Sequence, residues 1–154
     1  MLTKAYIPYK GYYSTPFCRW QGTMANENSI QLGATTAQRW IKKNNIDPLI
    51  FDYLYFGITV AQHHLFYSHT WAAALLVDGQ KDLPALMVHQ ACTTSTTCVH
   101  LAAVNIEVGT YNTAFALMAD RCSNGPHTVW PNPLGPGGEV LSENWMMDNF
   151  NGDP

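Results

Sequence analysis

The chain has 154 residues, about the length of one domain, and is 47% hydrophobic but only 12% charged. Such a low charged fraction indicates that apolar surface is buried beyond the core, in a homodimer or tetramer or against another polypeptide. The net charge of -3 and the pI near 6.0 provide no basic surface for nucleic acid or an anionic membrane. Neither is expected as a partner.

Targeting signals and metal motifs are both missing from the sequence. No N-terminal stretch has the pattern of a signal peptide and no apolar run reaches about 18 residues, so a soluble, cytoplasmic protein is expected. The cysteines form no Cys-x-x-Cys pair, and the histidines show no zinc-ligand spacing. His63, His64 and His69 come nearest to a metal cluster and are interpreted as surface or loop histidines. We expect no metal and no cofactor.

The chain opens with a β-rich stretch at residues 2–8, followed by an aromatic loop with glycine and proline at residues 10–21. A helix is then expected, capped by Asn28 or Ser29 and running to about Asn45. Apolar residues stand at helical spacing within it, at Ile30, Ala34, Ala37 and Ile41. An Ile-Asp-Pro sequence ends this helix.

Strands and helices alternate in the middle of the chain. β-Branched, aromatic and apolar runs predict strands at residues 51–60, 84–90 and 113–119. Composition predicts helices at residues 70–77 and at about 94–108, and Gly109 stands where the C-cap of the second helix belongs. Such alternation is typical of right-handed crossovers in a mostly parallel sheet, so the predicted fold class is α/β.

The composition changes after residue 120. Residues 125–138 contain four prolines and four glycines, which predicts a long loop without regular structure. We therefore divide the chain into an incomplete domain at residues 1–120 and the start of a loop region at residues 121–154. No final helix or strand is evident, and the chain is interpreted as truncated.

Cys92 is the candidate nucleophile. It stands where the apolar run of residues 84–90 gives way to a helix that begins near Thr94. The unpaired N–H groups and the positive dipole end of such a helix favour a thiolate over a thiol. The alternative interpretation is a small hydrophobic residue buried in the core.

Four short motifs follow one another at characteristic spacing. They are Ser-Thr-Pro-Phe-Cys-Arg-Trp-Gln-Gly at 14–22, Gln-Leu-Gly-Ala at 31–34, Asn-Ile-Asp-Pro at 45–48 and Gln-Ala-Cys-Thr-Thr-Ser at 90–95. In that order they resemble an Arg-Thr-Pro-Phe-Gly-x-Phe-Gly-Gly opening, a Glu-Leu-Gly-Ala helix, a Gly-Ile-Asp-Pro turn and an Arg-Gln-Cys-Ala-Ser-Gly nucleophile turn. These are motifs of the N-terminal half of the thiolases (acetyl-CoA acetyltransferases).

The resemblance implies a layered α/β fold and a coenzyme A thioester enzyme in which Cys92 carries the acyl group. The implied reaction is Claisen condensation, or thiolytic cleavage of a 3-oxoacyl-CoA, with acyl-CoA and CoA as the small-molecule partners. Thr93 and Ser95 would help to shape the acyl pocket. The family's Gly-Gly-x-Glu-x-Met-Ser segment reads Ala-Asp-Arg-Cys-Ser-Asn at 119–124, so substrate choice stays open. Decarboxylating and hydroxymethylglutaryl relatives fit as well.

The resemblance also implies catalytic motifs that these residues lack. The family takes its general base from Gly-His-Pro, its second cysteine from Cys-x-Gly and an oxyanion-hole ligand from Asn-Glu-Ala-Phe, and none of these sequences occurs here. The chain is therefore expected to carry the nucleophile and to need a complementary C-terminal half for Claisen chemistry.

Four further residues are weighed as members of the site. His89 is close to Cys92 in sequence and is either its base or a core or interface histidine, while His127 could fold over the pocket from the loop. His100 should lie about 12 Å further along the helix, too far to touch the thiol. Cys122 ends a strand near the edge where α/β sheets place ligands.

Two other functions remain open. One is a non-catalytic, thiolase-like scaffold subunit that pairs with an active partner or an acyl-carrier component. The other is a self-contained cysteine hydrolase that uses Cys92 with His89 or His127.

Overall fold

A computed structural model describes residues 2–60, 67–123, 128–130 and 141–143 of the chain. The chain divides into two compact units, residues 1–124 and residues 125–154. Within the described residues, no helix has the length and apolar character needed to cross a membrane.

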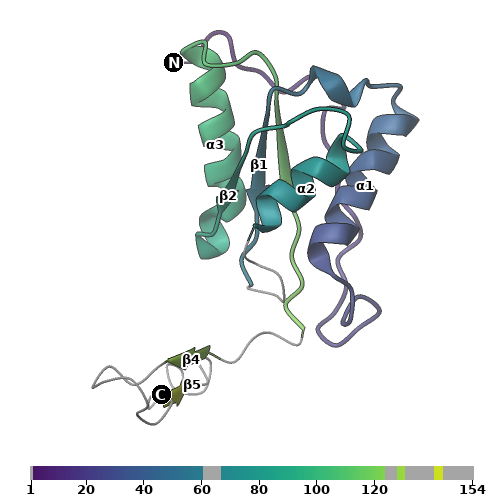
Figure 1. Cartoon of the computed structure of the whole chain (residues 1–154), viewed down its shortest axis with the longest axis vertical. Coiled ribbons are helices and arrows are strands. Elements are labelled where there is room, and N and C mark those ends of the chain that lie inside the picture. The colour runs from purple at the N-terminus through teal and green to yellow at the C-terminus, as the bar shows by residue number, and fades with distance from the viewer. Residues whose placement is uncertain (1, 61–66, 124–127, 131–140, 144–154) are drawn as a thin grey trace. The chain divides into compact units, whose positions relative to one another are not determined.

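A three-stranded parallel sheet forms the centre of the first unit. Its strands are β1 (Tyr53–Gly57), β2 (Ala85–Val88) and β3 (Ala114–Met118). β1 lies in the middle, and the strand order is β2-β1-β3 (Figure 1). Each strand lies within a predicted strand segment but is shorter, and the parallel pairing confirms the α/β fold class.

Helices cover both faces of this sheet. α1 (Ser29–Lys43) and α2 (Ser68–Leu76) pack on one face, and α3 (Thr94–Glu107) packs on the other. All three overlap the helices predicted from the sequence. Gly109 follows α3 with a φ of 81°, a left-handed conformation that confirms its predicted place at the end of the helix.

The sequence of α1 accounts for its start and its orientation. The Asn28 side chain accepts hydrogen bonds from the N–H groups of Ile30 and Gln31, at 3.0 and 3.1 Å, and so caps the helix. The predicted apolar positions are all buried, at Ile30, Ala34, Ala37 and Ile41. These side chains direct one face of α1 towards the sheet.

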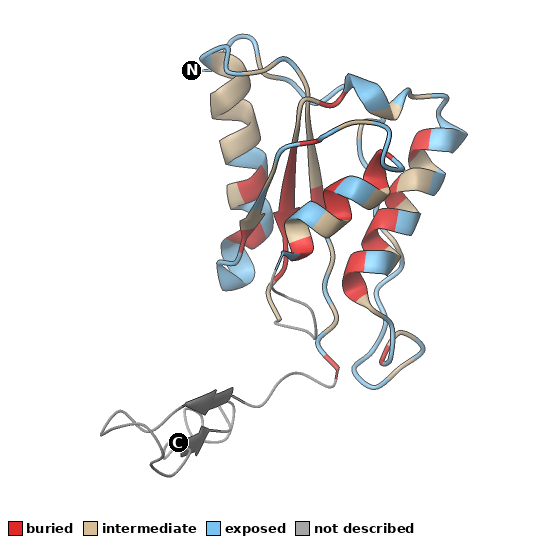
Figure 2. Cartoon of the chain, in the orientation of Figure 1, coloured by how far each residue is buried: buried red, intermediate tan, exposed pale blue. Residues whose placement is uncertain are grey.

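Alternation along β1 creates two separate cores. Leu54 and Phe56 face the larger core, between the sheet and helices α1 and α2, whereas Tyr55 faces a smaller core under α3. The smaller core, which we call the α3 core, has as its buried members Tyr55, Val88 and Cys98. Figure 2 shows buried residues along β1 and on the inner faces of all three helices.

The predicted β-rich opening at residues 2–8 is wrong, because no strand forms there. The backbone N–H groups of Thr3, Lys4 and Ala5 instead donate to the Glu107 carboxylate at the end of α3, at 2.9, 2.8 and 3.3 Å. A carboxylate thus satisfies donors that would otherwise need a neighbouring strand. Composition favoured a strand here but could not supply a partner for it.

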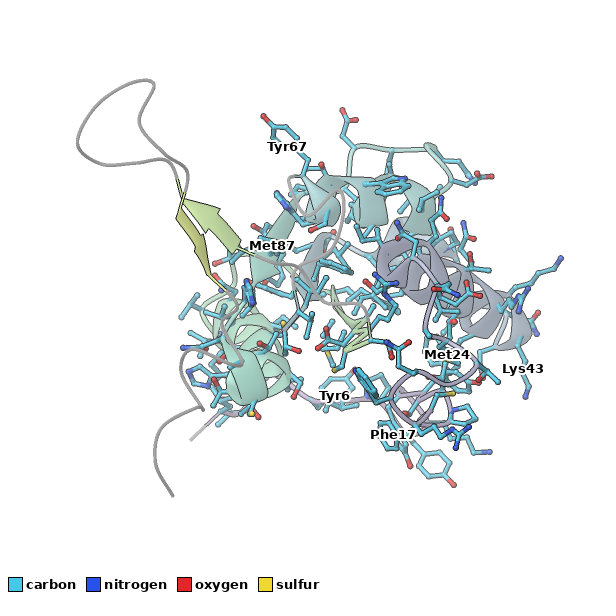
Figure 3. The ribbon with its side chains drawn as sticks, turned by 90° about the horizontal axis from the view of Figure 1, so that it is seen from below. Tyr6, Phe17, Met24, Lys43, Tyr67 and Met87 are labelled. Atoms are coloured by element: carbon cyan, nitrogen blue, oxygen red, sulfur yellow. The ribbon has the colours of Figure 1, made fainter. Side chains whose placement is uncertain are left out.

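The aromatic loop at residues 10–21 forms no helix or strand, as predicted. Aromatic side chains from residues 6–20 are strongly exposed, including Tyr6 at 82% and Phe17 at 98%, and Figure 3 shows these two on the outside of the first unit. This much exposed aromatic surface is unusual for an isolated domain.

The second unit contains a short antiparallel pair, β4 (Thr128–Trp130) and β5 (Leu141–Glu143), in which Val129 pairs with Ser142. The prediction that residues 125–138 lack regular structure is therefore wrong at β4. Its Thr-Val-Trp sequence has high β-propensity and lies between prolines, so it forms a strand just long enough to pair.

Candidate functional site

Cys92 lies in the turn that joins β2 to α3. After Val88 the chain passes through a single turn of 3-10 helix (Ala91–Thr93), and α3 begins at Thr94. The Cys92 thiol is exposed and free of any disulfide. The structure therefore contradicts the interpretation of Cys92 as a buried core residue.

The positive end of α3 faces this turn. No side chain caps the helix at Thr93. The N–H groups of Thr93 and Thr94 donate to the carbonyl oxygens of Gln90 and Ala91, so it is the dipole of α3 that supplies positive potential beside this turn. A negative charge at such a position is stabilised by about 1 kcal/mol. The arrangement suits the oxyanion that forms when a cysteine sulfur attacks a carbonyl carbon.

Gly57 allows α3 to approach the sheet directly below the turn. A β-carbon at this position would lie 2.9 Å from Cγ2 of Thr94 and 3.1 Å from Sγ of Cys98. Because Gly57 has no side chain, the first turn of α3, next to Cys92, can lie this close to the sheet.

A second group of polar contacts spans the carboxyl ends of the three strands. His89 follows β2, and its Nε2 lies 2.8 Å from the carbonyl oxygen of Thr59, which follows β1. Asp120 follows β3, and its carboxylate accepts hydrogen bonds from the Thr59 and Val60 N–H groups at 3.1 and 3.0 Å. It also accepts one from the Thr59 hydroxyl. Thr59 thus links the residues that follow its two neighbouring strands.

Thr59 and Asp120 were not identified from the sequence. The available signal was that each directly follows a predicted parallel strand, and the carboxyl ends of such strands meet at one edge of the sheet.

This contact limits what His89 can do. Because a carbonyl oxygen only accepts, Nε2 of His89 is the donor in this contact, and in the neutral imidazole Nδ1 then holds the lone pair. A role as base would therefore fall to Nδ1. His100 is exposed on α3, and His127 lies outside the described residues.

The other cysteines differ from Cys92 in their surroundings. Cys98, on the inner face of α3, is fully buried, and its burial raises the pKa of the thiol. Cys122 follows β3, and desolvation, with the nearby Asp120 carboxylate second, raises the pKa of its thiol. Cys18 is exposed, with its sulfur 3.4 Å from the Thr23 hydroxyl.

Thr93 and Ser95 are both exposed and close to Cys92 in the chain. No cluster of at least three His, Cys, Asp or Glu side chains suited to a metal occurs within the described part of the chain. His63 and His64 lie outside the described residues. His69 is in the first turn of α2, and its Nδ1 is buried without a hydrogen-bond partner in the part described.

The fold and the turn define a class: a layered α/β protein with an exposed cysteine between a parallel strand and the helix that covers it. The family described as thiolase, N-terminal domain, matches residues 11–141, so the chain belongs to the thiolase family through that domain. No curated protein matches the chain by sequence.

A solved structure shares this fold. The crystal structure of the Bacillus anthracis acetyl-CoA acetyltransferase superposes with a TM-score of 0.64 at 18% sequence identity. The match covers 79% of this chain and 31% of the acetyltransferase chain. The chain thus spans about a third of the length of the protein that it matches.

Proposed function

We propose that the chain is the nucleophile-bearing part of a thiolase-type acyl-CoA acyltransferase, with Cys92 as the nucleophile. The observation that carries the proposal is an exposed cysteine at the β2–α3 turn of a thiolase N-terminal domain. The substrates are coenzyme A thioesters, and the reaction needs no further cofactor. All four cysteines are free, as befits a protein of the reducing cytoplasm.

In the first half of the proposed reaction, the Cys92 thiolate attacks the carbonyl carbon of an acyl-CoA. A new carbon–sulfur bond forms, the bond to the coenzyme A sulfur breaks, and coenzyme A leaves as a thiolate that takes up a proton. The N–H group of Cys92, in the turn before α3, donates to the transient oxyanion. Thr93 and Ser95 line the acyl pocket, and Cys122 is a further candidate for its wall.

The second half is condensation. A base removes an α-proton from a second acyl-CoA, and the resulting carbanion attacks the thioester carbon on Cys92 and expels the Cys92 thiolate. Thiolytic cleavage is the reverse. Residues 1–154 contain neither Gly-His-Pro nor Cys-x-Gly. We assign the base and the second cysteine to a complementary C-terminal half.

The test is to incubate the purified chain with acetyl-CoA and to locate the acyl group by mass spectrometry. We expect one hydroxylamine-sensitive acetyl group on the peptide that contains Cys92. Cys92→Ser should lose the thioester, and Cys18→Ser, a matched change at another exposed cysteine, should retain it. Acetoacetyl-CoA should form only when the C-terminal half is supplied.

Other results would identify the rival functions. A folded chain without any adduct on Cys92 would overturn the proposal and favour a non-catalytic scaffold subunit. Hydrolysis of simple thioesters by the chain alone would favour a cysteine hydrolase. Condensation by residues 1–154 alone would place the base within this chain, with Nδ1 of His89 as the first candidate.

A further inference from the structure

We propose that Gln90 and Thr97 form a positioning pair, which holds the turn carrying Cys92 in the conformation needed for acyl transfer. The inference rests on the proposed function, since it assigns a role within the reaction of Cys92. Neither residue is a catalytic group. Each acts through the backbone of the turn.

Gln90 is hydrogen bonded to residues beyond Cys92 by its backbone and by its side chain. Its N–H donates to the Thr94 hydroxyl at 2.8 Å, and its carbonyl accepts from the N–H and hydroxyl of Thr93 at 3.1 and 2.7 Å. Its Oε1 accepts from the Thr97 hydroxyl at 2.5 Å. This last bond spans the most residues along the chain and connects Gln90, before the turn, to the second turn of α3.

The turn needs such support because Ala91 is in the left-handed region, with a φ of 47°. A residue with a β-carbon is unfavourable there and stays only where surrounding contacts hold it. Ala91 lies between Gln90, which makes these contacts, and Cys92. Its backbone angles therefore set the direction in which the Cys92 thiol leaves the chain.

Loss of the Gln90–Thr97 bond would release this constraint. The turn could then relax, and the thiol would spend less time in the orientation that the left-handed Ala91 gives it. Misplacement of a reacting group by about 1 Å can slow a reaction by about 100-fold, so a partial release should slow acylation of Cys92 by about tenfold.

The chain provides a matched control beside Thr97. Thr96 is exposed, and within the described residues its hydroxyl makes no hydrogen bond. Thr97→Val removes the hydroxyl and keeps the shape and the β-branch of the side chain. Thr96→Val makes the same change without touching the turn. Thr97→Ser retains a hydroxyl that can donate to Oε1 of Gln90.

The experiment measures the rate and half-saturation of Cys92 acylation by acetyl-CoA in the full chain, together with the rate of Cys92 alkylation by iodoacetamide. We expect Thr97→Val to lower the maximal acylation rate about tenfold, with unchanged half-saturation. Thr97→Ser should restore most of the rate, and Thr96→Val should match the wild type. The proposal would be overturned if Thr96→Val and Thr97→Val lowered the acylation rate equally. It would also be overturned if Thr97→Ser did not restore the rate.

A second variant tests the role of Ala91 and guards against simple misfolding. Glycine adopts the left-handed conformation without strain, so Ala91→Gly should recover part of the rate lost in Thr97→Val. A general loss of packing would not be rescued in this way, and absence of rescue would contradict the proposal. If the wild type forms no acyl adduct, the proposed function fails. In that case the alkylation rates of Thr97→Val and Thr96→Val still decide whether the pair positions Cys92.

Discussion

At the scale of single residues, the four thiols should differ in reactivity. Limiting iodoacetamide at neutral pH is expected to label Cys92 first, because its thiol is exposed beside the positive end of α3. Cys98 is buried, and the raised pKa values of Cys98 and Cys122 leave less thiolate at neutral pH. Peptide mapping by mass spectrometry measures the order. Earlier labelling of Cys18 or Cys122 would remove the main support for the site.

The location of Cys92 was predictable, but the contacts around it were not. A cysteine between an apolar run and a helix start is visible in the sequence because both patterns are local. The bond from Thr97 to Gln90 and the contacts of Asp120 with Thr59 depend on how side chains meet after folding. Neighbouring threonines such as Thr96 and Thr97 look equivalent in the sequence.

At the scale of elements, the contact between β1 and α3 should be intolerant of a side chain at Gly57. Gly57→Ala places a methyl group 2.9 Å from Cγ2 of Thr94, whose hydroxyl is already held by hydrogen bonds. We expect a loss of about 1–3 kcal/mol in the free energy of unfolding and slower alkylation of Cys92. Urea denaturation and iodoacetamide kinetics measure the two effects.

Gly79 provides the control for this substitution. Its φ is 65°, and a β-carbon there would meet nothing within 4 Å. Gly79→Ala should therefore cost about 1 kcal/mol through backbone strain while leaving the alkylation rate of Cys92 unchanged. Equal effects of the two substitutions on alkylation would show that Gly57 does not position the turn.

The attachment of the N-terminal segment to α3 should depend on pH. Hydrogen bonds from the Lys4 N–H and the Thr3 hydroxyl are the main causes that lower the pKa of Glu107 from 4.5 to about 2. Because the pKa in the folded state is depressed, the attachment contributes fully above about pH 4.5 and is lost as the pH falls towards 2. The amide proton shifts of Thr3, Lys4 and Ala5 should titrate together in NMR spectra, with a midpoint near 2.

Two substitutions complete this test. Glu107→Gln should abolish the shared titration, whereas Glu27→Gln, at an exposed glutamate elsewhere in the chain, should leave it unchanged. A midpoint near 4.5 in the wild type would show that the carboxylate does not hold the segment.

Periodic patterns predicted the elements well, and isolated compositional signals did not. α1 was recovered because its cap and its four apolar positions agree with one another. Residues 2–8 had strand composition, but pairing depends on a distant partner that composition does not reveal. At β4 the prolines masked a three-residue strand, because proline restricts only itself and its neighbours.

At the scale of the whole molecule, we expect association with a second copy or with a complementary half through α3 or β3. The outer side of α3 carries Val99, which is 40% exposed, and β3 ends at Met118, which is 43% exposed. Helices α1 and α2 cover the larger core, whereas no other described segment covers these two surfaces to the same extent. Sedimentation at micromolar concentration should show a dimer.

A charge on this surface should disrupt the association. Val99→Lys is expected to shift the chain to a monomer, whereas Ile50→Lys, at an apolar residue that is 49% exposed elsewhere, should leave the dimer intact. A wild-type monomer at all concentrations would contradict a homodimer and leave the complementary half as the expected partner.

The unequal cores on the two faces of the sheet have a consequence for local opening. α1 and α2 share the larger core, whereas α3 rests on the small α3 core and on a hydrogen bond of 3.0 Å from Asn105 to the Tyr55 hydroxyl. In native-state hydrogen exchange, the amides of α3 should therefore open at a lower free energy than those of α1. A partner bound over α3 would raise that opening free energy, so assembly would make local unfolding of the turn that carries Cys92 less frequent.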